Sequence, residues 1–409
     1  MSDEFLLGRE LVLNRDEKVY AYRLHFRSLS SGSVVPGVFP PADLILDLLS
    51  GSGTEEFQGE RKGILTISSD LLLSEALAAL PADRIILLLD RELLLNDTVR
   101  ERCHCLREAG FTLALDGGQF SPEIIELQGL IDIIGVDPTR IPADPGMVVE
   151  QFHQRQLLLL AERVSTRDEF AGLQGAGFDL FQGLFFTAPT LTAKKKLNET
   201  AAILLRIALL IINDGEVEAI VRTVQESPAL TYKLLLQANS VVVGVRREID
   251  SVRHAILLLG RDLVRRWAQT ELLASSGSHE RDNPLVELAT ARAGLMEQLC
   301  RSHPLVQGSR DFADRAFLVG TLSMLESIYN VPLEDLVASV ELSADVRVAL
   351  LRRSGLLGNL LTFVEALDLL NFKVGWEMLP KIDLSPRQVL EAQRRAWRCR
   401  AGGTGVSVI

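Results

Sequence analysis

The sequence predicts an α/β domain followed by an all-helical domain. Over the first half, short apolar strands alternate with amphipathic helices, which is typical of a parallel sheet with helical crossovers. After the lysine run at 194–196 the periodicity is helical alone. Between the two halves, the aromatic stretch 177–189 has Gly and Pro at its ends. We expect it to be a buried strand that closes the first domain.

The first domain opens with a strand at 10–13, a polar turn and a second strand with clear alternation at 19–27. Residues 28–41 are rich in Ser, Gly and Pro and predict a loop. The later strands are predicted at 64–68, 84–89, 111–115, 131–136 and 157–162. The helices are predicted at 43–49, 70–80, 97–109, 146–156 and 166–176.

The second half reads as helices with no convincing strand. Ser227 and Pro228 are suited to the N-cap and first position of one of them. The predicted helices lie at 199–212, 216–225, 228–238, 254–259, 261–273, 284–302, 312–329, 333–340, 344–351, 358–370 and 386–398. We therefore expect a first domain at 1–193, a second at 194–400 and a flexible tail at 401–409.

Acidic residues follow several of the predicted strands: Asp90, Asp116, Asp137 and Glu162. In a barrel of parallel strands these ends line one mouth, where ligands bind. A single acid in this place often caps the next helix instead. Because several acids share the position, the sequence favours a pocket at the mouth.

Composition excludes several classes of protein. The net charge of -11 argues against a broad nucleic-acid surface, which needs clustered Lys and Arg. No stretch is long and apolar enough to span a bilayer, and the N-terminus lacks a secretory pattern. Four cysteines in 409 residues do not form a disulfide framework, so a cytoplasmic location is expected.

Several short motifs in the first half resemble the EAL domain, a TIM-like (β/α)8 barrel that hydrolyses cyclic di-GMP with divalent metal. The similarity covers about residues 8–190. The motifs are YAYRLHFR at 20–27, ALD at 114–116, IGVD at 134–137, AERV at 161–164 and FQGLFF at 181–186.

This resemblance also shows departures from the family pattern. The Glu that gives the family its name is Arg23 here, and one of its paired aspartates is lost after Asp116. Two metal-binding positions of the family fall at Thr66 and Leu87, and the Lys that positions water falls at Gly135. The resemblance keeps Arg27, Asp116, Asp137, Glu162 and Gln182. Together with Arg23, these residues form the predicted ligand pocket, which we expect to be vestigial because the metal ligands are lost.

The second half resembles the HDOD domain, an all-helical relative of the HD phosphohydrolases. The residues that carry the resemblance are SPALTYKLLLQANS at 227–240 and IDSVRHAILLLG at 249–260. The chain has no His-Asp dipeptide, which the metal-dependent HD enzymes need. The resemblance therefore implies a non-catalytic interaction module.

The two resemblances lead to an expectation about activity. A metal-assisted phosphodiesterase needs carboxylates that hold its ions, and Leu87 offers no oxygen ligand while Arg23 brings positive charge. We expect no catalytic residues, no metal, no cofactor and no hydrolysis. The expected function is an inactive signal-transduction regulator that acts through protein contacts in cyclic di-GMP signalling. The alternative is a sensor that binds cyclic di-GMP without cleaving it, with Arg27 on a phosphate and Arg23 in place of a metal. An active phosphodiesterase is the third alternative, which the lost ligands disfavour.

The order of the two domains resembles the bacterial EAL–HDOD signalling proteins. This implies a cytoplasmic regulator whose partners are other signalling proteins, including enzymes that make or break cyclic di-GMP. We expect no membrane or nucleic-acid partner. Related barrels pair through the region around Asp116, but Gly117 and Gly118 alter that loop here, so both a homodimer and a monomer stay open.

Overall fold

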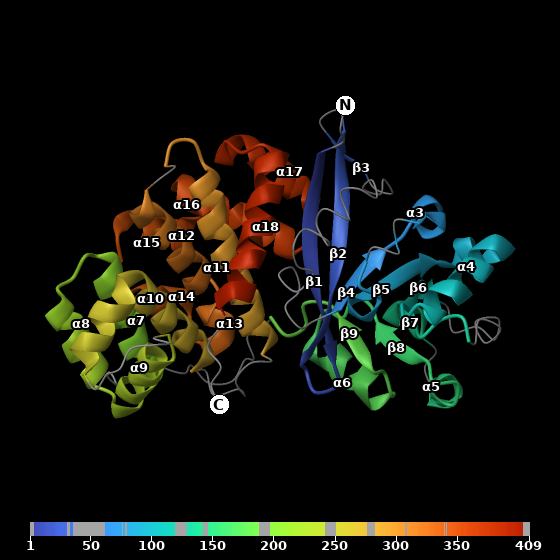
Figure 1. Ribbon diagram of the computed structural model, residues 1–409, viewed down its shortest axis with the longest axis horizontal. Coiled ribbons are helices and arrows are strands. Elements are labelled where there is room, and N and C mark those ends of the chain that lie inside the picture. The colour runs from blue at the N-terminus through green and yellow to red at the C-terminus, as the bar shows by residue number, and fades with distance from the viewer. Residues whose placement is uncertain are drawn as a thin grey trace. The chain divides into compact units, whose positions relative to one another are not determined.

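The computed structural model of the protein is drawn in Figure 1. It describes residues 4–30, 33–35, 62–75, 77, 80–118, 129–141, 146–187, 197–241, 251–275, 283–306, 309–338, 340 and 342–403. The chain forms two compact units. The barrel unit consists of Met1–Ala188, Glu365–Leu379 and Ser385–Ala401, and the helical unit of Pro189–Val364, Pro380–Leu384 and Gly402–Ile409.

Eight strands of the barrel unit form a closed barrel. They are β1 (Glu4–Asn14), β2 (Val19–Ser30), β4 (Lys62–Thr66), β5 (Ile85–Asp90), β6 (Thr112–Gly118), β7 (Ile133–Val136), β8 (Leu158–Ala161) and β9 (Leu180–Gln182). Each strand pairs with the next, β9 pairs with β1, and the pairing of β1 with β2 closes the ring. A short ninth strand, β3 (Ser33–Val35), pairs with the end of β2. The predicted barrel is therefore confirmed.

One strand departs from the expected arrangement of parallel strands. β1 runs antiparallel to both of its neighbours, whereas the other barrel strands pair in parallel. The cause is the tight turn between β1 and β2. The side-chain oxygen of Asn14 accepts bonds from the backbone N–H groups of Asp16 and Lys18, and Glu17 has a left-handed φ of 58°. A connection this short permits only an antiparallel pair.

The barrel interior is filled by apolar side chains from all eight strands: Val12, Ala21, Ile64, Ile86, Leu88, Ala114, Ile133, Leu160 and Leu180. Because side chains alternate along a strand, residues two positions further along point to the same side. This rule places Glu10 of β1 and Arg23 of β2 on the inner side of the barrel.

Helices cover the outside of the parallel strands: α3 (Ser69–Leu73), α4 (Asp97–Glu108), α5 (Gly146–His153) and α6 (Arg167–Gly175), with 3-10 turns η2 (Ala82–Arg84), η3 (Arg91–Leu95) and η5 (Pro138–Arg140). The start of α6 is fixed by a capping box, in which Thr166 and Glu169 bond each other's backbone N–H groups. The helix predicted at 43–49 lies outside the described residues.

The aromatic stretch at 177–189 contains β9 and a cluster of rings. Phe170 of α6 stacks on Phe185 at 4.5 Å and meets Phe181 edge-on at 4.6 Å. Gly183, with φ +142°, allows the chain to pass close to β8, because a Cβ here would lie 2.0 Å from the carbonyl oxygen of Val164. This close approach places Gln182 at the mouth.

The second half of the chain forms twelve helices among the described residues: α7 (Glu199–Ile212), α8 (Val217–Gln225), α9 (Pro228–Val241), α10 (Val252–Ala274), α11 (Pro284–Ser302), α12 (Arg310–Leu322), α13 (Leu325–Tyr329), α14 (Leu333–Ala338), α15 (Ala344–Arg352), α16 (Gly355–Asp368), α17 (Phe372–Ile382) and α18 (Pro386–Gly403). The all-helical prediction is confirmed for this part. α10 is interrupted at Gly260, where φ is +78° and where the sequence predicts a stop. The Ser227 hydroxyl accepts a bond from the N–H of Leu230 at 3.3 Å, as expected for an N-cap.

Two of these helices pack with the barrel strands. Most of α17 and of α18 belongs to the barrel unit, and the side chain of Gln393 donates a buried 2.7 Å bond to the carbonyl of Leu7 in β1. α17 has no counterpart among the predicted helices. The predicted boundaries at 193 and 400, and the flexible tail, stay predictions.

Candidate functional site

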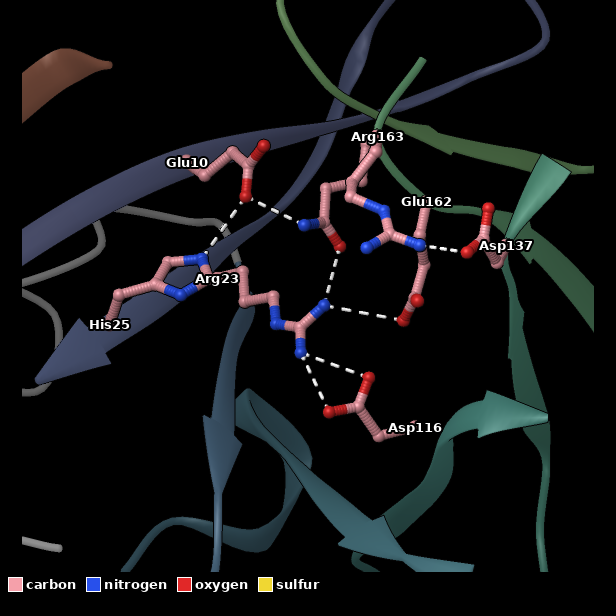
Figure 2. Close-up of polar contacts among 8 residues, drawn as sticks. Glu10, Arg23, His25, Asp116, Asp137, Glu162 and Arg163 are labelled. Carbon is pink, nitrogen blue, oxygen red and sulfur yellow. Dashed lines mark hydrogen bonds and ion pairs between the residues drawn. The ribbon is translucent and has the colours of Figure 1, made fainter. Parts of the chain in front are cut away.

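Arg23 is the centre of a polar cluster at the C-terminal ends of the parallel strands (Figure 2). One nitrogen of its guanidinium, Nη2, donates to both carboxylate oxygens of Asp116 at 3.0 Å. The other, Nη1, donates to Gln182 at 2.8 Å and to Glu162 at 3.3 Å. The cluster therefore joins β2, β6, β8 and β9, and four of the six predicted pocket residues lie together.

Arg23 is buried, with 8% of its surface exposed. A buried cation needs paired acids and filled hydrogen bonds, which Asp116 and Glu162 supply. Its Nε atom, however, is buried without a hydrogen-bond partner among the described residues. One donor of the guanidinium is therefore buried and unpaired among the described residues.

Two residues of the site were not predicted from the sequence, Glu10 and His25. The carboxylate of Glu10 accepts a 2.6 Å bond from Gln182 and contacts Nε2 of His25 at 3.0 Å. Burial lowers the pKa of His25, with the charges of Arg23 and Arg27 acting in the same direction against the bond to Glu10. Glu10 thus accepts a hydrogen bond from Gln182, whose side-chain oxygen in turn accepts one from Arg23. The available signal was the alternation of β1, which places Glu10 on the same face as the core residue Val12.

Glu162 lies directly after β8 and is buried. Its pKa is raised to about 7, first by burial and then by the neighbouring Asp116, while the charges of Arg23 and Arg163 oppose the shift. The carboxylate has room because Gly135 has no side chain. A Cβ at Gly135 would lie 2.5 Å from Oε1 of Glu162. The lack of a side chain at Gly135 therefore leaves space for the acid.

Asp137 is near this cluster but has different partners. Its side chain accepts bonds from the backbone and hydroxyl of Thr139, at 3.0 and 2.8 Å, and pairs with Arg163. Burial alone would raise its pKa, but these bonds together outweigh that effect and lower it. Asp137 is thus both the N-cap of η5 and the ion-pair partner of Arg163 (Figure 2), whose side chain is exposed.

Arg27 lies further along β2, and its Nη1 donates to the carbonyl of Phe26 at 2.8 Å. Its guanidinium carbon lies 5.4 Å from the centre of the Phe372 ring, at the start of α17. Burial, and then the charge of Arg23, lower the pKa of Arg27. The structure therefore does not bring Arg27 into the hydrogen-bond network of Arg23.

The structure changes the interpretation of Leu87. Ile86 and Leu88 fill the barrel interior, so Leu87 points outward, and it could not have supplied a ligand at the mouth. The residue of β5 in register with Asp116 is Asp90. Its side chain accepts a 3.1 Å bond from the N–H of Glu92 and caps η3, so Asp90 follows the capping alternative.

The divalent ion that an EAL resemblance implies can be tested against these residues. Within the described ranges, no group of three or more His, Cys, Asp or Glu side chains could hold a metal ion. The space between Asp116 and Glu162 is filled by the guanidinium of Arg23. The described residues therefore do not fit a divalent ion, and we derive no chemical step through one.

Comparison with known families identifies the helical part. The model of the HDOD domain matches residues 199–333. This finding confirms the resemblance of the second half of the chain. It covers the helices from α7 to the start of α14.

Two relatives match the chain almost from end to end. The cyclic di-GMP phosphodiesterase CdgJ of Vibrio cholerae is 26% identical over 408 residues, covering 95% of this chain and 91% of the relative. The uncharacterized protein YuxH of Bacillus subtilis is 23% identical over 390 residues, covering 92% and 94%. The similarity therefore extends over more than nine tenths of this chain and of each relative.

Solved structures of EAL domains are similar to the first half. The FimX EAL domain of Xanthomonas citri, in complex with c-diGMP, covers 48% of this chain and 91% of its own, with 15% identity and a TM-score of 0.38. The PaMucR phosphodiesterase, in its c-di-GMP complex, covers 44% and 94%, with 16% identity and a TM-score of 0.37.

The comparisons correct the expectation about activity. The sequence led us to expect a catalytically inactive regulator and not an enzyme, but a relative that matches 95% of the chain is named a phosphodiesterase. The physical reason for the error is that Leu87 lies on the outer face, so its apolar side chain says nothing about the mouth. The apolar side chain of Leu87 therefore gives no support to a loss of activity.

Other expectations are tested less directly. In the part of the chain that the structure covers, no helix has the length and apolar character to cross a membrane. The cytoplasmic location, the signalling partners, the homodimer and the absence of nucleic-acid binding stay predictions.

Proposed function

We propose that the protein is a cyclic di-GMP phosphodiesterase and that its reaction takes place at the mouth of the barrel. The observation that carries this proposal is the similarity to the Vibrio cholerae phosphodiesterase over 408 residues. The chemistry at the mouth supports it, because guanidinium groups that attract phosphate lie near a carboxyl group that can accept a proton.

The substrate carries two phosphodiesters, each with one negative charge. Arg23 and Arg163 lie at the mouth and supply positive charge for it, and Arg27 adds a further cation on β2. Arg163 is the most accessible of these cations, and Arg23 is the deepest. We expect the exposed guanidinium to meet the substrate first and Arg23 to contact the phosphate that reacts.

The proposed reaction is hydrolysis of one phosphodiester. The oxygen of a water molecule forms a bond to phosphorus, and the bond from phosphorus to one ribose oxygen breaks. Glu162 accepts a proton from the attacking water, the leaving ribose oxygen takes up a proton from solvent water, and Glu162 returns its proton to the hydroxide that remains. Arg23 stabilises the charge that develops on the phosphate oxygens. The product is the linear dinucleotide with one terminal phosphate.

The test is an activity assay on the full-length protein with cyclic di-GMP, in separate reactions with Mg²⁺, Mn²⁺ and a chelator. The linear product is separated by chromatography. We expect turnover, and we expect Glu162→Gln to lower kcat by about a hundredfold or more, the usual contribution of a proton-transferring group. Glu169→Gln is the matched control, since it changes an acid of α6 and keeps the capping box.

The proposal would be overturned by the absence of product in all three reactions. Binding of cyclic di-GMP without turnover would also contradict it. Equal loss of kcat in Glu162→Gln and Glu169→Gln would remove the assigned role of Glu162.

A further inference from the structure

We infer that Phe372 is a positioning residue for Arg27 and that the C-terminal segment 365–401 forms part of the dinucleotide site. This inference rests on the proposed function. The guanidinium carbon of Arg27 lies 5.4 Å from the centre of the Phe372 ring, and only 5% of Phe372 is exposed. A cation at this distance from a ring is held by the electrons of the ring face.

The sequence makes room for this contact at Gly8 of β1. Gly8 pairs with His25 and lies two residues before Glu10, on the same face of the strand. A Cβ at this position would lie 2.8 Å from the Phe372 ring and 2.6 Å from Leu370. A larger residue would displace the ring, so Gly8 allows Phe372 to lie where it contacts Arg27.

A second contact holds the same segment on the barrel. Gln393 of α18 donates its buried 2.7 Å bond to the backbone of Leu7, the neighbour of Gly8. Val389, Ala392 and Ala396 of α18 are buried as well. The barrel strands and both helical stretches, Glu365–Leu379 and Ser385–Ala401, form one compact unit. The position of Phe372 is therefore fixed from two sides.

The consequence for Arg27 is a restricted guanidinium. A free arginine side chain samples many rotamers, and ordering it when a ligand binds costs conformational entropy. Here one face lies on a ring and Nη1 donates to the carbonyl of Phe26. The bond to the Phe26 carbonyl is the only hydrogen bond of the Arg27 side chain within the described part of the chain. Its remaining N–H groups can therefore bind a phosphate. Phe372 of α17 thus restricts the Arg27 guanidinium before the substrate binds.

The test uses the full-length protein with Phe372→Leu, which removes the ring and keeps most of the apolar volume, and with Phe372→Trp, which keeps a ring. We expect Phe372→Leu to raise KM for cyclic di-GMP about fivefold to thirtyfold, with kcat within about twofold. We expect Phe372→Trp to have the KM of the unmodified protein. Phe152→Leu, in the buried face of α5, is the control: it should lower the melting temperature and leave KM unchanged.

A double-variant cycle shows whether the effect passes through Arg27. In the Arg27→Met protein, Phe372→Leu should cause no further rise in KM, because the cation it positions is absent. A full additional rise would overturn the inference, and so would unchanged KM in a well-folded Phe372→Leu protein. If Phe372→Leu does not fold, Gly8→Ala replaces it, with the same expected rise in KM.

The two proposals fail in different ways. If the unmodified protein binds cyclic di-GMP in a calorimetric titration but does not cleave it, the proposed function is wrong, and the same variants test the inference through Kd. If turnover is normal and Phe372→Leu has no effect on KM, the inference alone is wrong. An unmodified protein that neither binds nor cleaves the dinucleotide overturns both.

Discussion

At the scale of single residues, Arg23 decides the charge of the candidate site. Its guanidinium lies between Asp116 and Glu162, whose side chains are 33% and 8% exposed. We expect Arg23→Met to lower the free energy of unfolding by about 3 kcal/mol, because it leaves Glu162 buried without its cation. Urea denaturation monitored by circular dichroism measures this change. Arg163→Met, which removes a cation that is 68% exposed, should cause at most a small loss. Equal losses in the two variants would contradict the central place of Arg23.

The pKa of Glu162 predicts how stability depends on pH. Its pKa is raised from 4.5 to about 7 in the folded protein, chiefly by burial. Between these values the folded state binds more protons than the unfolded state, so this group makes stability fall as pH rises through the window. Glu162→Gln cannot lose the proton. We therefore expect the free energy of unfolding of the variant to rise relative to that of the unmodified protein as the pH increases from about 4.5 to 7. Denaturant titrations across this range test the prediction, and a constant difference between the two proteins would disprove it.

At the scale of elements, a buried ion pair joins two helices of the helical unit. Arg265 of α10 and Asp314 of α12 are 2.5 Å apart, and only 1% of the Arg265 side chain is exposed. We expect Asp314→Asn to lower the free energy of unfolding by about 3–5 kcal/mol, since it leaves a buried cation unpaired. Thermal unfolding provides the measurement. Asp214→Asn is the control, because that pair with Arg261 is exposed and should contribute nothing measurable.

The elements also show what the sequence can predict. Continuous apolar runs such as 85–89 give a buried strand by composition alone, and the predicted strands correspond to β4–β8. It is harder to predict on which side of a strand a side chain lies. A one-position shift in the alignment of Leu87 moves this residue from the inner side of the barrel to the outward side of β5. α17 was missed because Pro380 lies inside it, and proline normally interrupts a helix.

The site was predicted in part, and the reason is again physical. The acids and Gln182 follow strand ends, which a sequence reveals, so four of the six pocket residues meet at Arg23. Glu10 lies on the antiparallel strand, where strand-end reasoning does not apply. Phe372 lies hundreds of residues from Arg27, and no local pattern connects them.

At the scale of the whole molecule, the C-terminal helices are predicted to stabilise the barrel. A chain that ends at Val364 lacks α17 and α18 and leaves the carbonyl of Leu7 without its bond from Gln393. It also exposes the apolar surface that these helices cover. We expect faster hydrogen exchange in β1 and a lower melting temperature for the barrel. Mass spectrometry of exchanged peptides makes the comparison. Unchanged protection of β1 would show that the barrel is complete without the helices.

The bond between Leu7 and Gln393 spans 386 positions in the chain. β1 and β2 can form their hairpin early in synthesis. The pairing of β1 with β9 and the bond from Gln393 of α18 to Leu7 can form only after those later elements have been made. During translation, at about 5–20 residues per second, the first strand therefore leaves the ribosome tens of seconds before its last contact exists. The carbonyl of Leu7 therefore lacks its hydrogen-bond partner until α18 has been made, whereas the edge of β1 that pairs with β9 is covered once Gln182 has been made.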